Sequence, residues 1–172
     1  SKNIVLMIIT IINLLLITSA LSGLTQHKLI YYSEYSFTLA IDNSKSMEAD
    51  DFSPNRLESA KKTAETFVDL TPPGTKMAVV SFSGNSFIEQ SITEDKSLVK
   101  SALSEITLSS IGGTDLNEAV LTGTNLLQGE DAKSIILISD GKINVGTIED
   151  AIQYADVNDV IVHTIGIGTI EG

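Results

Sequence analysis

Three short stretches of the sequence carry oxygen-donor side chains where predicted strands end or a predicted helix begins. They read Asp42-Asn43-Ser44-Lys45-Ser46, Gly112-Gly113-Thr114-Asp115 and Asp140-Gly141. The alternate spacing of the first stretch allows a tight loop to turn three side chains toward one point, and hard oxygen donors of this kind suit Mg²⁺. The Gly112-Gly113 pair allows the backbone to approach closely enough for Thr114 to reach the same point. The pattern predicts that two carboxylates and three hydroxyls gather around a divalent cation.

The first stretch also has a purely structural explanation. A lone Asp-x-Ser-x-Ser is typical of an Asx turn followed by a helix cap. The three stretches together favour a metal site, because they lie at elements that meet at one edge of the predicted sheet. Without a cation, Asp42, Asp140 and nearby Asp115 would repel one another, so a bound ion would also have an electrostatic role.

The elements that position these stretches alternate between strands and amphipathic helices. Short apolar runs predict strands, and apolar residues at helical spacing predict helices. Strands are expected at 37–41, 77–82, 87–92, 134–139 and 160–165, and helices from about 56, around 98–106, from about 116 and at 148–157. This alternation predicts an α/β fold with a doubly wound, mostly parallel sheet covered by helices on both faces.

An apolar segment precedes this pattern at the N-terminus. Residues 4–24 carry no charge, and as a helix they would span about 31 Å, which matches one bilayer core. The alternative is a cleaved signal peptide with a small-residue cleavage site at Ala20-Leu21-Ser22. A retained anchor is favoured because apolar residues continue past that site. We therefore expect a transmembrane anchor with its juxtamembrane linker at 1–32 and a folded domain at 33–172.

Composition excludes several classes of function. The chain contains no Cys, which excludes disulfide scaffolds, thiolate metal sites and cysteine nucleophiles. Residues 34–172 contain 9 basic and 22 acidic side chains, a net charge of −13. A surface with this charge would repel phosphate, so a nucleic-acid-binding role is excluded.

The chain resembles the von Willebrand factor A domains that carry a metal-ion-dependent adhesion site (MIDAS). The motif reads DNSKS, then GGTD, then ISDG, and the resemblance runs from about Phe37 to Gly168. The segments DFSPNRLESAKK, VVSFSGNS and TIGIGT look most like the membrane-anchored aerotolerance (Bat) type. The resemblance implies direct metal ligation by Ser44, Ser46 and Thr114, with Asp42 and Asp140 bound directly or through water.

The resemblance also bears on residues around the motif. Asp115 is expected to cap its helix, with Glu118 at capping-box spacing, while its position beside Thr114 leaves a weaker metal role open. Lys45 stands where the family often has Gly, although a basic residue at this position is familiar in the Bat type. Members usually continue with a further helix and a sixth strand after the stretch that matches TIGIGT, so the 33–172 domain is expected to lack them.

The function implied by the resemblance is a membrane-tethered protein-binding module without enzymatic activity. A cation, Mg²⁺ with Mn²⁺ or Ca²⁺ as alternatives, would bind an Asp or Glu carboxylate of a protein partner. The Bat type implies assembly of protein complexes at the cell envelope, with an extracytoplasmic domain and with other VWA membrane proteins or a MoxR-type AAA+ ATPase as partners.

Two other functions remain open at this stage. The first is a surface adhesin or receptor that uses the same metal site on an external ligand. The second is a metal-assisted hydrolase in which Asp42 or Asp140 activates water. The hydrolase is disfavoured because no His stands beside the hydroxyl-rich stretches in the sequence.

Overall fold

The computed structural model describes residues 2–21, 35–142 and 148–169. Contacts divide the chain into two units, Ser1–Ile30 and Tyr31–Gly172, and each unit is described by itself. The expected domain boundary between residues 32 and 33 lies outside the described residues.

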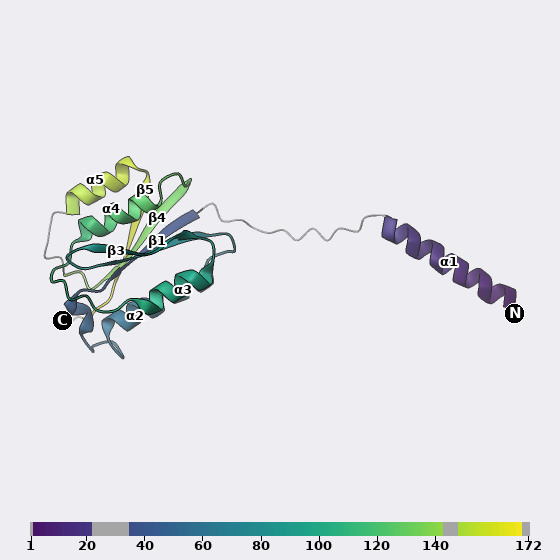
Figure 1. The fold of residues 1–172 in the computed structure, drawn as a ribbon, viewed down its shortest axis with the longest axis horizontal. Coiled ribbons are helices and arrows are strands. Elements are labelled where there is room, and N and C mark those ends of the chain that lie inside the picture. The colour runs from purple at the N-terminus through teal and green to yellow at the C-terminus, as the bar shows by residue number, and fades with distance from the viewer. Residues whose placement is uncertain (1, 22–34, 143–147, 170–172) are drawn as a thin grey trace. The chain divides into compact units, whose positions relative to one another are not determined.

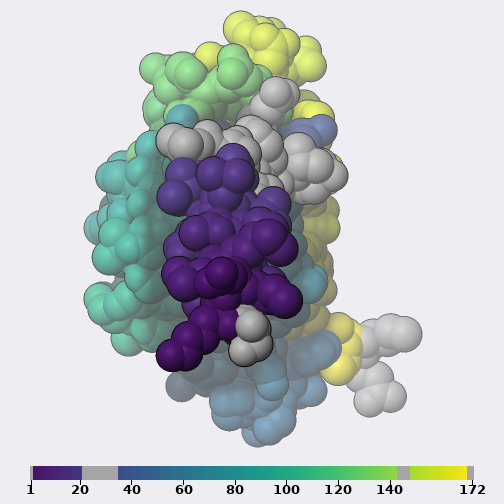
Figure 2. All heavy atoms as spheres, turned by 90° about the vertical axis from the view of Figure 1, so that its right-hand side faces the viewer, coloured from purple at the N-terminus to yellow at the C-terminus, as the bar shows by residue number. Residues whose placement is uncertain are grey.

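The N-terminal unit contains a single described helix, α1 (Lys2–Leu21). Its large apolar side chains are exposed, from 49% at Ile8 to 66% at Leu14, and Figure 2 draws the helix in purple with all its heavy atoms. By length and composition, Lys2–Ala20 is a candidate membrane span. The remainder of the expected span, after residue 21, lies outside the described residues.

The second unit is built on a five-stranded sheet with the order β3-β2-β1-β4-β5. The strands are β1 (Tyr35–Asp42), β2 (Lys76–Phe82), β3 (Ser86–Thr93), β4 (Ala132–Ser139) and β5 (Val160–Gly166). All neighbours pair in parallel except β2 and β3, which are antiparallel. The mostly parallel sheet expected from the sequence is confirmed.

Four α-helices cover the two faces of this sheet in three layers (Figure 1). They are α2 (Arg56–Leu70), α3 (Lys96–Glu105), α4 (Leu116–Leu126) and α5 (Ile148–Val157), and a 3₁₀ helix η1 (Lys45–Glu48) follows β1. The layers follow from strand alternation, because successive side chains point to opposite faces. Leu39 and Ile41 pack with α2 and α3, whereas Ala40 between them packs with α4 and α5.

A buried ammonium group joins α2 to α3. Lys61, on α2, donates to the carbonyl oxygens of Ser104 at 2.9 Å and Ile106 at 3.1 Å, at the C-terminal end of α3. These carbonyls have no partner within their own helix, so the ammonium satisfies them. Lys61 therefore helps to orient α3 on the sheet. Among the described residues, its hydrogen bonds go to Glu58 and to the end of α3 and not to the polar residues that follow the strands.

Candidate metal centre

The loop after β1 brings two serine hydroxyls together. The backbone N–H of Ser44 donates to Asp42 Oδ1 at 2.9 Å, which forms the Asx turn expected for this sequence. The hydroxyl oxygens of Ser44 and Ser46 lie 3.2 Å apart. Ser44 occupies the N-cap position of η1 but makes no side-chain cap hydrogen bond. The Asx turn is therefore present, but the side-chain helix cap that a purely structural role would provide is not formed. The two hydroxyls form an adjacent pair of oxygen donors.

Asp42 is a fully buried carboxylate at the end of the central strand. Its Oδ2 accepts a 2.6 Å hydrogen bond from Ser139, the last residue of β4. Burial raises the pKa of the Asp42 carboxyl, although the hydrogen bonds from Ser139 and Ser44 oppose this shift. Among the described residues, no basic side chain forms an ion pair with Asp42. A bound cation would balance this buried charge.

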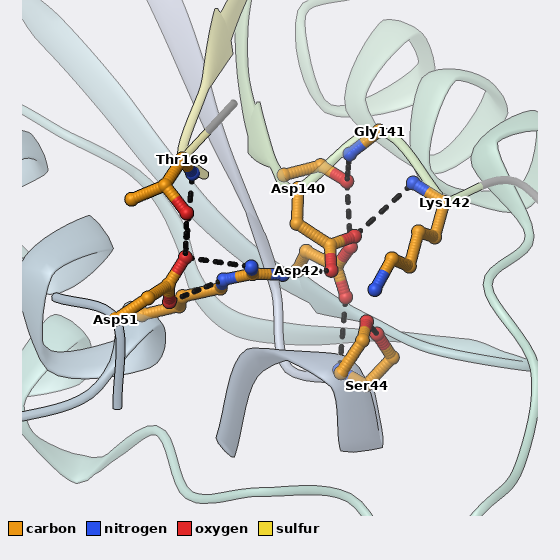
Figure 3. A network of polar contacts seen from close by, with 10 residues as sticks. Asp42, Ser44, Asp51, Asp140, Gly141, Lys142 and Thr169 are labelled. Carbon is orange, nitrogen blue, oxygen red and sulfur yellow. Dashed lines mark hydrogen bonds and ion pairs between the residues drawn. The ribbon is translucent and has the colours of Figure 1, made fainter. Parts of the chain in front are cut away.

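Asp140 directly follows β4 and has a different environment. Its Oδ2 accepts from Arg56 Nη1 at 2.9 Å and its Oδ1 accepts from the backbone N–H of Lys142 at 3.1 Å. Ser139, which precedes Asp140 in the chain, donates its hydroxyl to Asp42 and accepts from the N–H of Gly141 at 3.1 Å; Figure 3 shows Asp42, Asp140 and Gly141 together. Asp42 and Asp140 are thus brought to one edge, but of the two only Asp140 has a cationic partner within the described part of the chain.

Arg56 is the residue at this edge that the sequence reasoning missed. It was recognised only as the start of a helix, and its side chain is 3% exposed in the structure. A cation in the first turn of a helix opposes the helix dipole. This placement is a feature of the sequence that could have drawn attention to Arg56, but it does not identify the partner, since Lys96 at the start of α3 shares it and donates to backbone carbonyl oxygens.

Thr114 reaches the same edge through the neighbouring strand. It is 1% exposed, and the N–H of the next residue, Asp115, donates to Ser83 O at 2.7 Å, immediately after β2. Because Phe82 pairs with Asp42 in the sheet register, this loop lies beside the end of β1. The structure therefore places all the predicted site residues at the carboxyl edge of β1, β2 and β4.

Asp115 has the capping role expected for it. Its Oδ1 accepts from the N–H groups of Asn117 at 3.0 Å and Glu118 at 3.3 Å, at the start of α4. In a capping box, the Glu118 side chain would accept a hydrogen bond from the N–H of Asp115. Here that N–H donates to the carbonyl oxygen of Ser83 instead.

The close approach at this loop depends on a different glycine from the one expected. A Cβ at Gly84 would lie 2.3 Å from Gly112 O, whereas a Cβ at Gly112 would meet nothing within 4 Å. Gly113 has a φ of 101°, a left-handed conformation that favours glycine. Gly84 therefore makes room for the Thr114 loop, and Gly113 turns it.

The donor set determines which ion the site would suit. Among the described residues, no group of three or more His, Asp or Glu side chains is arranged so that it could hold a metal ion. The oxygen-bearing side chains placed at this edge are those of serine, threonine and aspartate. Hydroxyl and carboxylate oxygens fit a hard divalent cation and do not favour a soft transition metal.

The sequence model of the von Willebrand factor type A domain matches residues 37–142. This chain belongs to the von Willebrand factor type A (VWA) family. The match includes every residue of the candidate metal centre.

Two similar solved structures come from Bacteroides. One is the conserved hypothetical protein BatB from Bacteroides thetaiotaomicron, with 32% identity and a TM-score of 0.75 over 80% of this chain and 69% of that chain. The other is an aerotolerance-related membrane protein from Bacteroides fragilis, with 29% identity and a TM-score of 0.74 over 80% of this chain and 70% of that chain. The expected similarity of this VWA domain to the Bat type is confirmed.

Two further comparisons concern metal and length. A mussel byssus protein, proximal thread matrix protein 1, was solved with a zinc-occupied MIDAS motif; it is 26% identical with a TM-score of 0.67, over 78% of this chain and 36% of that chain. A UPF0353 protein from Mycolicibacterium vanbaalenii is 29% identical over 96% of this chain and 54% of its own length. The chain spans about half the length of the curated relatives it matches.

Proposed function

We propose that this VWA domain is a membrane-tethered protein-binding module that depends on a divalent cation, with Mg²⁺ preferred. The observation that carries the proposal is the buried Asp42 carboxylate, which has no ion-pair partner among the described residues and stands beside the hydroxyl pair of Ser44 and Ser46. The proposed ligands are Asp42, Ser44, Ser46, Thr114 and Asp140.

The chain's own residues divide the work of holding the ion. Ser44, Ser46 and Thr114 offer neutral oxygens, while Asp42 and Asp140 supply the negative charge that keeps a cation at this edge. When bound, the cation would supply an electrophilic position that accepts an Asp or Glu carboxylate from a protein partner. Neutral direct ligands favour this role, because they leave more of the ion's positive charge for the partner.

The candidate membrane helix and the similarity to Bat proteins support a role at the cell envelope. In this proposal the VWA domain lies on the extracytoplasmic side and assembles or maintains protein complexes, with other VWA membrane proteins or a MoxR-type AAA+ ATPase as partners. The proposal includes no catalysis. His163 lies opposite Ile136, in the middle of β4, and therefore is not at the strand ends where a hydrolytic base would be needed.

Titration of the full chain in detergent tests the metal centre. We expect one Mg²⁺ per chain, with binding lost in Asp42→Ala and in Ser44→Ala/Ser46→Ala. Mg²⁺ at 100 times its dissociation constant should stabilise the fold by about 2.7 kcal/mol, because the cation binds only the folded state. Glu149→Lys, on the exposed surface of α5, is the control and should retain binding. A melting temperature that responds to neither Mg²⁺ nor chelator would contradict the proposal.

Affinity capture from membranes tests the partner. Chelation should release a protein partner, and Thr114→Ala should weaken capture by about 1–3 kcal/mol, the usual effect of a lost polar contact. This variant retains both aspartates, so folding should change little. Capture that survives chelation and Thr114→Ala but fails on changes to the helix surfaces would show a docking module independent of metal. If the captured partner were instead a ligand from outside the cell, the result would favour the alternative function of a surface adhesin or receptor.

A further inference from the structure

A buried guanidinium lies between two carboxylates beside the candidate metal centre (Figure 3). Arg56 donates through Nε and Nη2 to the two oxygens of Asp51, both at 2.7 Å, and through Nη1 to Asp140 at 2.9 Å. The side chains of Arg56 and Asp140 are 3% and 0% exposed, and that of Asp51 is 19% exposed. The three residues form a line of alternating charge that ends at a proposed metal ligand.

The division of hydrogen bonds gives the two carboxylates different roles. Asp51 occupies one edge of the guanidinium in bidentate geometry, which is the strongest arrangement for such a pair. Asp51 is itself held by the N–H and hydroxyl of Thr169, at 3.3 and 3.2 Å. Asp140 receives the remaining Nη1 group. Asp51 therefore anchors Arg56, and Arg56 neutralises Asp140.

Asp42 and Asp140 differ in how their negative charge is compensated. A buried carboxylate needs a compensating charge, and Asp140 has one that is part of the chain. A cation that uses the charge of Asp140 must share that carboxylate with Arg56 and must also approach a fixed positive charge. Both effects oppose metal binding.

We propose that Arg56 is a resident countercharge that competes with the cation for Asp140 and thereby weakens metal binding, and that Asp51 limits this competition by holding the other edge of the guanidinium. Arg56 is a positioning residue, since it acts on the metal through Asp140. This inference rests on the proposed metal-dependent function and adds a means by which the chain sets its own metal affinity.

The proposal predicts opposite effects from the two partners of one ion pair. Arg56→Met removes the positive charge with little change in side-chain volume and should tighten Mg²⁺ binding roughly tenfold, which corresponds to about 1.4 kcal/mol. Asp51→Asn removes the anchor and a negative charge while it keeps the guanidinium, and should weaken Mg²⁺ binding several-fold. A purely structural role for the ion pair would leave the Mg²⁺ dissociation constant unchanged in both variants.

The experiment measures the Mg²⁺ dissociation constant by calorimetry and the melting temperature with chelator and with saturating Mg²⁺, using the full chain in detergent. Arg56→Met should lower the melting temperature in chelator by about 10 °C, because Asp51 and Asp140 lose their shared partner. Saturating Mg²⁺ should recover most of this loss. Lys61→Met is the matched control, since it removes another buried cation of α2, whose bonds among the described residues go to Glu58 and to carbonyl oxygens at the end of α3. It should lower the melting temperature equally in both conditions.

The outcomes separate this inference from the proposed function. If the wild-type chain binds Mg²⁺ and Arg56→Met binds it equally or more weakly, the countercharge role is wrong and the metal centre stands. If neither the wild type nor Arg56→Met binds Mg²⁺, the metal centre itself is wrong, and the inference fails with it. If Arg56→Met does not fold, Asp51→Asn decides, because unchanged or tighter Mg²⁺ binding in that variant overturns the proposal.

Discussion

At the residue scale, three aspartates near one edge of the sheet have three different environments. Asp42 is buried and has no ion-pair partner in the part of the chain that the structure describes, Asp140 is buried with Arg56, and Asp51 holds Arg56 from a partly exposed position. Burial raises the pKa of Asp42, whereas hydrogen bonds from Arg56 lower the pKa of Asp51 to about 2. The same side chain therefore serves as a candidate metal ligand in one place and as a fixed anion in another.

The lowered pKa of Asp51 predicts how stability depends on pH. A carboxyl whose pKa is lower in the folded state binds fewer protons there, so its ionised form stabilises the fold above its ordinary pKa of 3.8. This contribution should disappear as the pH falls from 3.8 toward about 2. In chelator, the free energy of unfolding of the wild type should fall more steeply over this range than that of Asp51→Asn, as measured by urea unfolding.

An exposed ion pair supplies the control for this experiment. Asp69 pairs with Lys100 at 2.6 Å, and the two side chains are 60% and 38% exposed. Surface pairs of this kind contribute about 0–1 kcal/mol. Asp69→Asn should therefore follow the wild-type curve closely, and an Asp51→Asn curve parallel to the wild type would contradict the role assigned to the Arg56–Asp51 pair.

At the element scale, the metal centre depends on how closely two loops approach each other. The turn after β2 carries Gly84, and its lack of a side chain allows the Gly112 backbone to lie against it. The N–H of Asp115 donates to Ser83 in the same turn. The position of Thr114 is therefore set by contact between two loops as well as by the helix that follows it.

Gly84→Ala should disturb the centre without touching a proposed ligand. The added Cβ would lie 2.3 Å from Gly112 O, and relief of such an overlap in a packed region usually costs about 1–3 kcal/mol. The melting temperature should fall by about 2–10 °C, and Mg²⁺ titration should show weaker binding because Thr114 is displaced.

Gly112→Ala is the matched control for this change. A Cβ at Gly112 would meet nothing within 4 Å, so the stability change should stay within about 0.5 kcal/mol. If the two variants behaved alike in melting and Mg²⁺ titration, the close approach at Gly84 would not be what positions Thr114.

At the scale of the whole molecule, an apolar N-terminal helix, in which Lys2 is the one charged residue of the described part, accompanies a strongly acidic domain. The described part of the apolar segment, α1, has the length and composition of a membrane span. Residues 34–172 carry a net charge of −13, which raises the local concentration of divalent cations and repels anionic lipid headgroups. Apolar burial of α1, and not charge attraction, is therefore the force expected to hold the protein at a membrane.

Alkaline carbonate extraction tests this expectation. The full chain should stay in the membrane pellet, because carbonate removes proteins held by charge but not a spanning helix. Ile11→Lys, at the centre of α1, should weaken insertion by about 3 kcal/mol or more and shift the chain toward the soluble fraction, while Glu149→Lys on α5 should not. If the mass of the mature protein matched a chain that starts at Gly23, the segment would instead be a cleaved signal peptide.

The sequence by itself determined the order of the elements, the mostly parallel sheet and the identity of the candidate ligands. These features depend on local patterns. Apolar runs and helical spacing predict the elements. Parallel strands end at the same edge of a sheet, so Asp42 and Asp140 are expected there whatever the arrangement of the helices. The motif residues could therefore be named before their positions in space were known.

Only the tertiary structure decided which charges meet. Arg56 and Asp140 are 84 residues apart, and their contact requires α2 to pack on the sheet so that its first turn reaches the end of β4. Gly84 likewise owes its importance to a loop that follows it at a distance along the chain. Such pairings depend on how whole elements pack against one another. That packing is set by many apolar contacts spread along the chain, so it cannot be inferred from a short sequence motif.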